Sequence, residues 1–258
     1  MGDIEITRHG ATQVLRFNRP EKKNALTAAM YTALADALEA GDRDPAITAH
    51  AFLGGDGVFS AGNDIGEFVA SASGDGGVMQ AIIRFVRLLP LVEKPMLAGV
   101  DGLAVGIGTT LLFHCDFVLA SERATFRTPF LDLGLVPEAA SSLLGPRRIG
   151  HPRAFELLVL GASFDAERMR EAGLVNAVVP ADELAPRILA VGEALAQKPP
   201  EALAAARRLM RGDPTAVSAA VEAEAAIFAR QLRSPEAAEA FRAFIEKRRP
   251  DFARIRGA

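Results

Sequence analysis

Two short segments near the N-terminus alternate polar and apolar residues, at Ile4–Arg8 and Thr12–Phe17. This period of two is typical of half-buried β-strands, because successive side chains on a strand point to opposite faces. His9-Gly10-Ala11 separates the two segments and suits a tight connection. The sequence therefore predicts a β-hairpin at the start of the chain.

Beyond the hairpin, strand patterns and helix patterns take turns. After a polar loop at 18–24, Thr27 is a suitable N-cap for a helix that runs to about Asp42, in which Met30, Leu34 and Leu38 recur at helical spacing. Further patterns predict strands at 48–53, 95–100, 116–120 and 174–179, a loop at 59–65 leading into a helix, and helices at 78–89 and 107–114. This alternation favours an α/β fold with parallel strands joined by right-handed crossovers.

The last part of the chain has a different pattern. From Ala181 onward only helical patterns are present, and Lys198-Pro199-Pro200 interrupts them. We therefore expect a core domain at 1–197 and a C-terminal helical segment at 198–258 that serves oligomerisation and pocket closure. Small and polar residues at 71–77 predict a linker.

Composition narrows the class of protein. The chain has 258 residues, half of them hydrophobic, and a net charge of -3. It therefore has enough apolar residues for a large core but lacks the basic balance of a nucleic-acid-binding protein. A single cysteine indicates a reducing compartment, no apolar run approaches the roughly 20 residues of a membrane span, and the first residues lack the features of a signal peptide. We expect a cytoplasmic enzyme without nucleic-acid or membrane partners.

The candidate chemistry lies between Gly99 and Glu138. A glycine-rich turn at 99–108 opens an apolar helix, and the first N–H groups of a helix have no partner within it. Further on, Glu138 stands alone among apolar and small residues. Together these features indicate an oxyanion trap that faces a single acid/base group.

Several short motifs, taken in order, resemble the crotonase superfamily, the enoyl-CoA hydratase/isomerase fold. They are Asn18-Arg19-Pro20, Asn24-Ala25-Leu26, Phe59–Ile65, the turn at 99–108, Cys115-Asp116 and Ala172–Val175. The resemblance implies a spiral of ββα units with a C-terminal helical segment, assembled as a homotrimer or a dimer of trimers. It also implies an acyl-CoA thioester substrate, with CoA as part of the substrate and neither a metal nor a redox cofactor.

The resemblance also separates subfamilies. Hydratases of this superfamily carry two glutamates, and the matching positions here hold Thr110 and Phe130. The segments 126–130 and 137–142 instead look like the Δ3,Δ2-enoyl-CoA isomerase branch, which places its one catalytic glutamate in a Pro-Glu pair. The resemblance thus implies that Glu138 moves the proton when a 3-enoyl-CoA becomes the 2-trans isomer in fatty acid metabolism.

The same resemblance assigns the remaining site residues. It places the backbone N–H groups of Asn63 and Ile107 in the oxyanion hole, and each follows a glycine, as an exposed amide in a turn requires. Lys22 or Lys23 is expected to meet the CoA phosphates. The implied substrate-binding residues are Lys22, Ala25, Ala61, Gly62, Asp64, Ile65, Leu103, Val105, Gly106, Pro129, Phe130 and Leu133.

Other interpretations stay open at this point. The chain is alternatively an enoyl-CoA hydratase or another crotonase lyase, or a non-catalytic acyl-CoA-binding protein. Glu138 alternatively stabilises a helix start through the helix dipole, and Asp132 is a rival acid. Asp64 is expected to cap a helix. Phe228, Phe241 and Phe244 are expected to pack in the core or at a subunit interface, or to cap the acyl pocket, and Lys247-Arg248-Arg249 to lie on a solvated face or to hold CoA phosphates.

Overall fold

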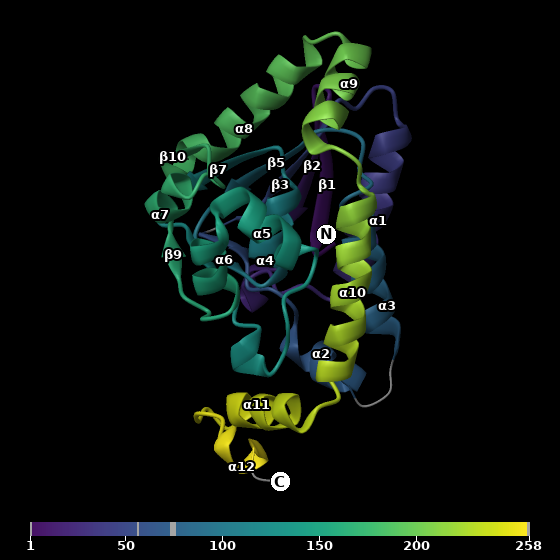
Figure 1. The fold of residues 1–258 in the computed structure, drawn as a ribbon. Helices are drawn as coiled ribbons and strands as arrows, with labels where there is room; N and C mark the ends of the chain where they lie inside the picture. The colour runs from purple at the N-terminus through teal and green to yellow at the C-terminus, as the bar shows by residue number, and fades with distance from the viewer. Residues whose placement is uncertain (1, 56, 73–75, 257–258) are drawn as a thin grey trace.

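The computed structural model describes residues 2–55, 57–72 and 76–256. It contains two sheets and many helices (Figure 1). The strands are β1 (Ile4–His9), β2 (Thr12–Phe17), β3 (Ala49–Leu53), β4 (Val58–Ser60), β5 (Met96–Val100), β6 (Leu103–Val105), β7 (Phe117–Ser121), β8 (Thr125–Arg127), β9 (Phe164–Asp165) and β10 (Ala177–Val179). The α-helices are α1 (Ala28–Arg43), α2 (Ile65–Ala72), α3 (Gly76–Leu88), α4 (Ile107–Thr110), α5 (Ser141–Ile149), α6 (His151–Leu158), α7 (Ala166–Glu171), α8 (Ala181–Ala196), α9 (Pro200–Arg211), α10 (Thr215–Gln231), α11 (Pro235–Ile245) and α12 (Ala253–Arg256). Three short 3₁₀ helices are η1 (Pro20–Lys22), η2 (Leu111–His114) and η3 (Leu131–Leu133).

The larger sheet has the strand order β1-β2-β3-β5-β7-β10. β1 and β2 form the predicted antiparallel hairpin, and the remaining neighbours are parallel. In this register Val14, Ala51 and Leu97 lie in one row. They face α8, while the next residue of each strand faces α1 and α3, so both faces of the sheet are buried. A parallel sheet with helices on both faces is the predicted α/β class.

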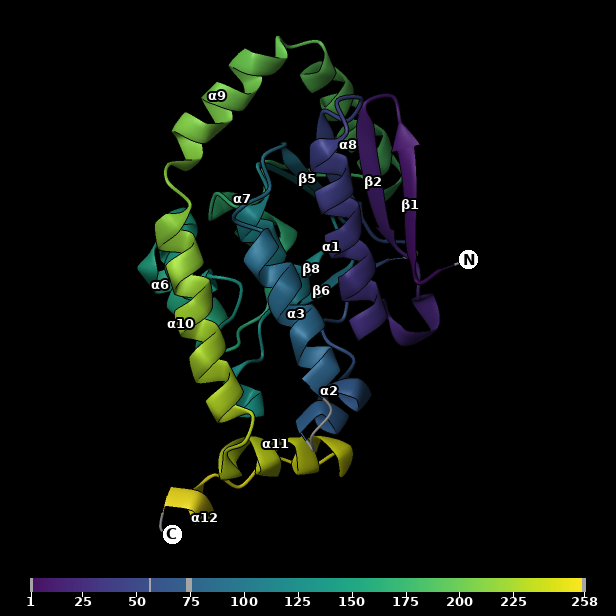
Figure 2. The same cartoon turned by 90° about the vertical axis from the view of Figure 1, so that its right-hand side faces the viewer.

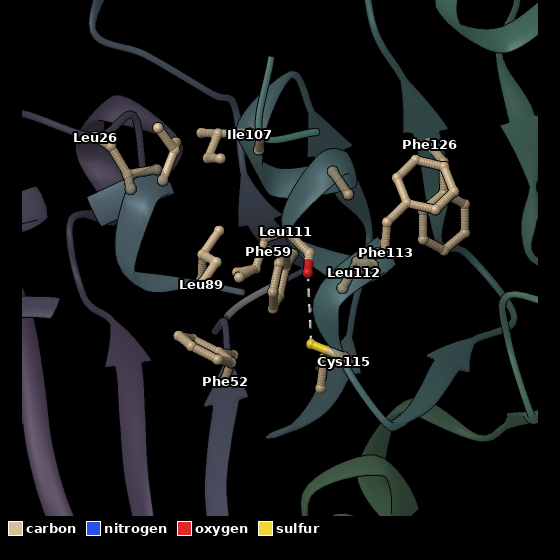
Figure 3. Close-up of a cluster of buried hydrophobic side chains, with 14 of the residues drawn as sticks. Leu26, Phe52, Phe59, Leu89, Ile107, Leu111, Leu112, Phe113, Cys115 and Phe126 are labelled. Carbon is tan, nitrogen blue, oxygen red and sulfur yellow. Dashed lines mark hydrogen bonds between the residues drawn. The ribbon is translucent and has the colours of Figure 1, made fainter. Parts of the chain in front are cut away.

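The smaller sheet, in the order β4-β6-β8-β9, positions the site. Its inward residues Phe59, Ala104 and Phe126 join the main hydrophobic core. Figure 3 shows part of this core, in which Ile107 lies near Leu26 and Leu89. The Ile107 side chain is only 3% exposed. Because this side chain is anchored in the core, the first turn of α4 is held in a fixed place.

Most sequence-predicted elements are present, with differences at their ends. Thr27 caps α1 by accepting a hydrogen bond from the Met30 amide, as predicted. The helix expected at 107–114 is instead α4 followed by η2, and the strand expected at 174–179 is reduced to β10. The linker expected at 71–77 is wrong at both ends, because α2 continues to Ala72 and α3 begins at Gly76, while 73–75 lie outside the described residues.

The terminal helices do not pack as one unit against the core. α9 extends away from the sheets, whereas α10 lies beside α3 and also contacts α5 (Figure 2). α11 crosses the opposite end of the molecule from α9 and contacts η3. Of the helices in the described ranges, none has both the length and the apolar character needed to cross a membrane. α10 and α11 therefore reach the region where the predicted site residues lie, and α9 does not.

Candidate functional site

A cavity of about 630 Å³ lies between the smaller sheet and the helices α2, α10 and α11. Its lining comes from the loop after β2, the end of β4, the turn before α4 and the segment after β8. The structure brings most of the sequence-predicted site residues together here. They are Lys22, Ala25, Ala61, Gly62, Asn63, Asp64, Ile65, Val105, Gly106, Ile107, Pro129, Phe130 and Leu133.

Leu103, which the resemblance places among the substrate-binding residues, does not line this cavity. It lies at the far end of β6, paired with Val58 and Thr125. A strand advances about 3.3 Å per residue, so Leu103 is about 7 Å further along than Val105 at the cavity.

Two backbone N–H groups at the cavity are free to bind a ligand. Leu26 and Asn63 form a parallel β-bridge, in which the Leu26 amide donates to the Gly62 carbonyl and the Asp64 amide donates to the Leu26 carbonyl. Asn63 lies between Gly62 and Asp64, so its own N–H group points away from Leu26. Ile107 is the first residue of α4, where an N–H has no acceptor within the helix. In the described ranges, no residue accepts a hydrogen bond from either amide.

Glycine is needed at the residue before each of these amides. Gly62 has φ of 85° and Gly106 has φ of 56°, in the region that L side chains rarely adopt. A Cβ on Gly62 would also lie 2.9 Å from the carbonyl oxygen of Val105, and one on Gly106 would lie 3.9 Å from Gly62 Cα. The two turns therefore approach each other closely, as two donors to one ligand atom require.

Glu138 is partly buried and is not itself among the residues that line the cavity. Thr110, three residues after Ile107, donates a hydrogen bond from Oγ1 to Glu138 Oε1. Burial raises the pKa of Glu138 from 4.5 to about 8, against the Thr110 hydrogen bond, and the charge of Glu224 raises it further. Burial therefore outweighs the Thr110 hydrogen bond in setting the pKa of Glu138.

The chain turns sharply directly after Glu138. Ala139 and Ala140 both have φ of 56°, the left-handed region that costs a non-glycine residue about 1–3 kcal/mol. Such a conformation persists only where the surroundings fix it. The two alanines are almost completely buried, so the turn is held by packing and by hydrogen bonds from neighbouring elements.

Tyr31 links Asn63 to the region of Glu138. Its side chain on α1 is 1% exposed, and its hydroxyl donates a hydrogen bond to Asn63 Oδ1. Burial raises the pKa of Tyr31, and the nearby Glu138 carboxylate raises it further. Tyr31 is thus a neutral donor that fixes the Asn63 side chain. The sequence prediction missed it because its helical spacing is that of an ordinary core residue.

Several charged residues lie at the cavity but are already paired. Arg19 binds Asp64 at 2.8 Å, and Asp64 Oδ1 caps α2 by accepting from the amides of Gly66 and Glu67. Asp64 is therefore the predicted cap. The rival acid Asp132 lines the cavity but is exposed and paired with Arg127 at 2.8 Å.

The other end of the cavity is aromatic. The Phe68 ring lies 5.8 Å from Phe228 and 5.9 Å from Phe241, between ring centroids, and Phe244 completes the wall. Arg248 from the C-terminal basic run also lines the cavity and pairs with Glu239 at 2.6 Å. The arrangement combines an apolar wall with cations nearby, which suits an apolar chain on a charged carrier.

Other reactive residues do not form a second site. Burial raises the pKa of Cys115 to about 12, and its Sγ contacts the Leu111 carbonyl oxygen at 3.7 Å (Figure 3). The thiol is thus a core group, and His114 beside it in the sequence is also fully buried. Over the ranges that the structure describes, no three His, Cys, Asp or Glu side chains gather as metal ligands would.

Comparisons with known proteins agree on one family. The model of the enoyl-CoA hydratase/isomerase family matches residues 7–254. Enoyl-CoA delta isomerase 2 of Rattus norvegicus is 33% identical over 95% of this chain, and the chain spans only 64% of that relative. The 2,3-dehydroadipyl-CoA hydratase of Escherichia coli K12 is 31% identical over 98% of this chain and 99% of its own length.

Solved structures give the same result. An enoyl-CoA hydratase/isomerase from Pseudoalteromonas atlantica T6c has a TM-score of 0.92 at 40% identity, covering 97% of this chain and 100% of its own. OdaA of Pseudomonas aeruginosa has a TM-score of 0.89 at 38% identity, covering 95% and 99%. With the fold, the family match and the relatives in agreement, the chain belongs to the enoyl-CoA hydratase/isomerase family of the crotonase superfamily.

Proposed function

We propose that this protein is an acyl-CoA isomerase that moves the double bond of a 3-enoyl-CoA to the 2-trans position. The observation that carries the proposal is Glu138, a carboxylate of raised pKa that accepts a hydrogen bond from Thr110, three residues after Ile107, whose free N–H group lies at the cavity with that of Asn63. The rat relative, named an enoyl-CoA delta isomerase, supports the same reaction.

The reaction follows from these groups. Glu138 removes a proton from C2, and the thioester becomes a dienolate whose negative charge builds up on the thioester oxygen. The N–H groups of Asn63 and Ile107 donate to that oxygen, and one such donor is worth about 2.7–4 kcal/mol. The oxygen then reforms its carbonyl, a double bond forms between C2 and C3, and C4 takes the proton back from Glu138.

The site is less suited to hydration of a double bond than to isomerisation. Adding water across a double bond requires a second group to hold and activate the water molecule. The two positions that carry glutamates in hydratases hold Thr110, which is bonded to Glu138, and Phe130, which lines the cavity as an apolar wall. Glu138 alone would have to perform both tasks.

The remaining parts of the substrate fit the rest of the cavity. We infer that the acyl chain lies against the aromatic wall and that Lys22 meets the CoA phosphates, with CoA as part of the substrate and no further cofactor. A homotrimer or dimer of trimers, a cytoplasmic location and the division at 197–198 stay predictions. The assembly is testable by light scattering.

The reaction should depend on pH through Glu138. Only the carboxylate form removes a proton, and burial raises the pKa of Glu138 to about 8. We therefore expect log(kcat/KM) to rise by about one per pH unit below 8 and to level off above it. The Kd of a saturated acyl-CoA, measured over the same range, separates binding from chemistry. A profile that stays flat from pH 6 to about pH 9 would exclude Glu138 as the base.

Two substrates distinguish the candidate activities. With 3-hexenoyl-CoA, we expect the absorbance of a conjugated thioester to appear, because the product carries its double bond next to the carbonyl. With crotonyl-CoA, we expect that absorbance to persist. Its loss by hydration, with no isomerisation of 3-hexenoyl-CoA, would make the protein a hydratase. Tight binding of both thioesters without turnover would make it an acyl-CoA-binding protein.

A further inference from the structure

We propose that Glu224 on α10 is a positioning residue for the Glu138 base: it fixes the turn behind Glu138 and keeps a negative charge beside it. Glu224 does not line the cavity and lies 84 residues from the amide of Ala140 that it binds. The inference rests on the proposed function, because it assigns Glu224 a role only if Glu138 is the base.

The contacts of Glu224 are specific to this turn. Its Oε2 accepts a hydrogen bond from the Ala140 amide at 2.6 Å, and its Oε1 accepts from the Ser142 amide at 2.9 Å and from the Ser142 hydroxyl. The side chain is 6% exposed. Burial raises the pKa of Glu224, and the three donors on its two oxygens oppose that rise by stabilising the carboxylate form. Glu224 therefore accepts hydrogen bonds from the backbone amides on both sides of Ser141.

His114 holds the same turn from the opposite direction. Its Nε2 lies 2.7 Å from the carbonyl oxygen of Ala139, which can only accept, so Nε2 carries the proton. Burial lowers the pKa of His114 to about 3, and the ring is neutral. The two left-handed residues after Glu138 are thus each held by a side chain from another part of the chain. His114 donates to the Ala139 carbonyl, and Glu224 accepts from the Ala140 amide. Of these two side chains, Glu224 is the charged one.

The charge of Glu224 acts in an enclosed region. The titratable groups that face Glu138 are Glu224 from α10 and Tyr31 from α1, with His114 from η2 on the adjoining carbonyl. The tyrosine and histidine are neutral near pH 7. A like charge favours the protonated form of its neighbour. Glu224 therefore makes Glu138 a stronger base once it is ionised.

Glu224→Gln tests both parts of the role. The amide keeps the shape but loses the charge and places an N–H group against one of the backbone donors. We expect kcat with 3-hexenoyl-CoA to fall by about 10- to 100-fold at little change in KM, because small displacements of a catalytic group are costly. We also expect the acidic limb of the pH profile to move to lower pH, a readout that a purely structural residue would leave in place.

The matched control is Glu222→Gln on the same helix. Glu222 is exposed and pairs with Arg87 at 2.6 Å, so this variant removes an equal charge from the outer side of α10. We expect its kcat and pH profile to match those of the unmodified protein. If Glu224→Gln gives the same result as Glu222→Gln, the proposal is wrong.

Two further variants keep the outcomes apart. If Glu224→Gln does not fold, Ser142→Ala carries the test, because it removes one donor to Glu224 and leaves the charge; an unchanged kcat would then overturn the proposal. Glu138→Gln separates the inference from the function on which it rests. An active Glu138→Gln removes the proposed function, whereas an inactive one together with a fully active Glu224→Gln removes only the role of Glu224.

Discussion

Glu138→Gln is expected to lower the isomerisation of 3-hexenoyl-CoA by about 10²–10⁴-fold, the usual contribution of a general base. The amide has the shape of the carboxyl group and still accepts from the Thr110 hydroxyl, but it cannot take a proton from C2. Binding should be almost unaffected, because the amide has nearly the size of the carboxyl group and the lining of the cavity is unchanged. The measurement is kcat by the appearance of the conjugated thioester, with the Kd of a saturated acyl-CoA beside it.

The same variant should be more stable than the unmodified protein at alkaline pH. The pKa of Glu138 is about 8 in the folded protein against an ordinary value of 4.5, so the folded state holds its proton more tightly than the unfolded state does. The buried charge therefore destabilises the fold increasingly as pH rises from 4.5 to about 8. Thermal melts should show a higher Tm for Glu138→Gln above pH 8 and no difference near pH 4.5.

A different acid would give a different pair of results. If Glu138→Gln retained its activity while Asp132→Asn lost it, the proton transfer would belong to Asp132. Asp132 is exposed and paired with Arg127 at 2.8 Å. Asp132 lines the cavity, whereas Glu138 is not among the lining residues and contacts Thr110, so this pair of variants decides between the two acids.

The sequence predicts those helices and strands that are long enough to show a periodic pattern of apolar residues. β1 begins with alternating apolar and polar residues, Thr27 caps α1, and the buried strand β3 is apolar apart from His50. The strands of the smaller sheet have only two or three residues each, too few to show a period, and the sequence does not predict them as strands. These short strands nevertheless carry the turns at Gly62 and Gly106.

The candidate site likewise contains residues that sequence motifs predict and residues that only the structure identifies. Asn63, Ile107 and Glu138 are found by motif, since each lies in a short segment with a recognisable spacing. Tyr31 and Glu224 belong to helices whose spacing predicts packing, and their partners lie 32 and 84 residues away. Such contacts are fixed by the way α1 and α10 pack, which no local pattern contains. The residues that tune and hold the base are therefore visible only in three dimensions.

Ile107→Pro is the sharpest test of the backbone donors. Proline has no N–H, so the change deletes one donor to the thioester oxygen and leaves the other at Asn63. The first position of a helix tolerates proline, and Gly106 before it has no Cβ to clash with the proline ring. Removing one such donor typically costs about 10²–10³-fold in kcat. We expect a loss of that size in the isomerisation of 3-hexenoyl-CoA.

The control must account for the Ile107 side chain, because it is packed in the core. Ile107→Ala removes most of that packing and keeps the N–H, so it should be destabilised, by about 2–5 kcal/mol, and remain active at temperatures where it is folded. Equal activity losses in the two variants would show that the core contact matters and the amide does not. A large loss of activity in Ile107→Pro alone assigns that loss to the missing hydrogen bond. The proposed role of the Ile107 N–H group is to stabilise the negative charge on the thioester oxygen.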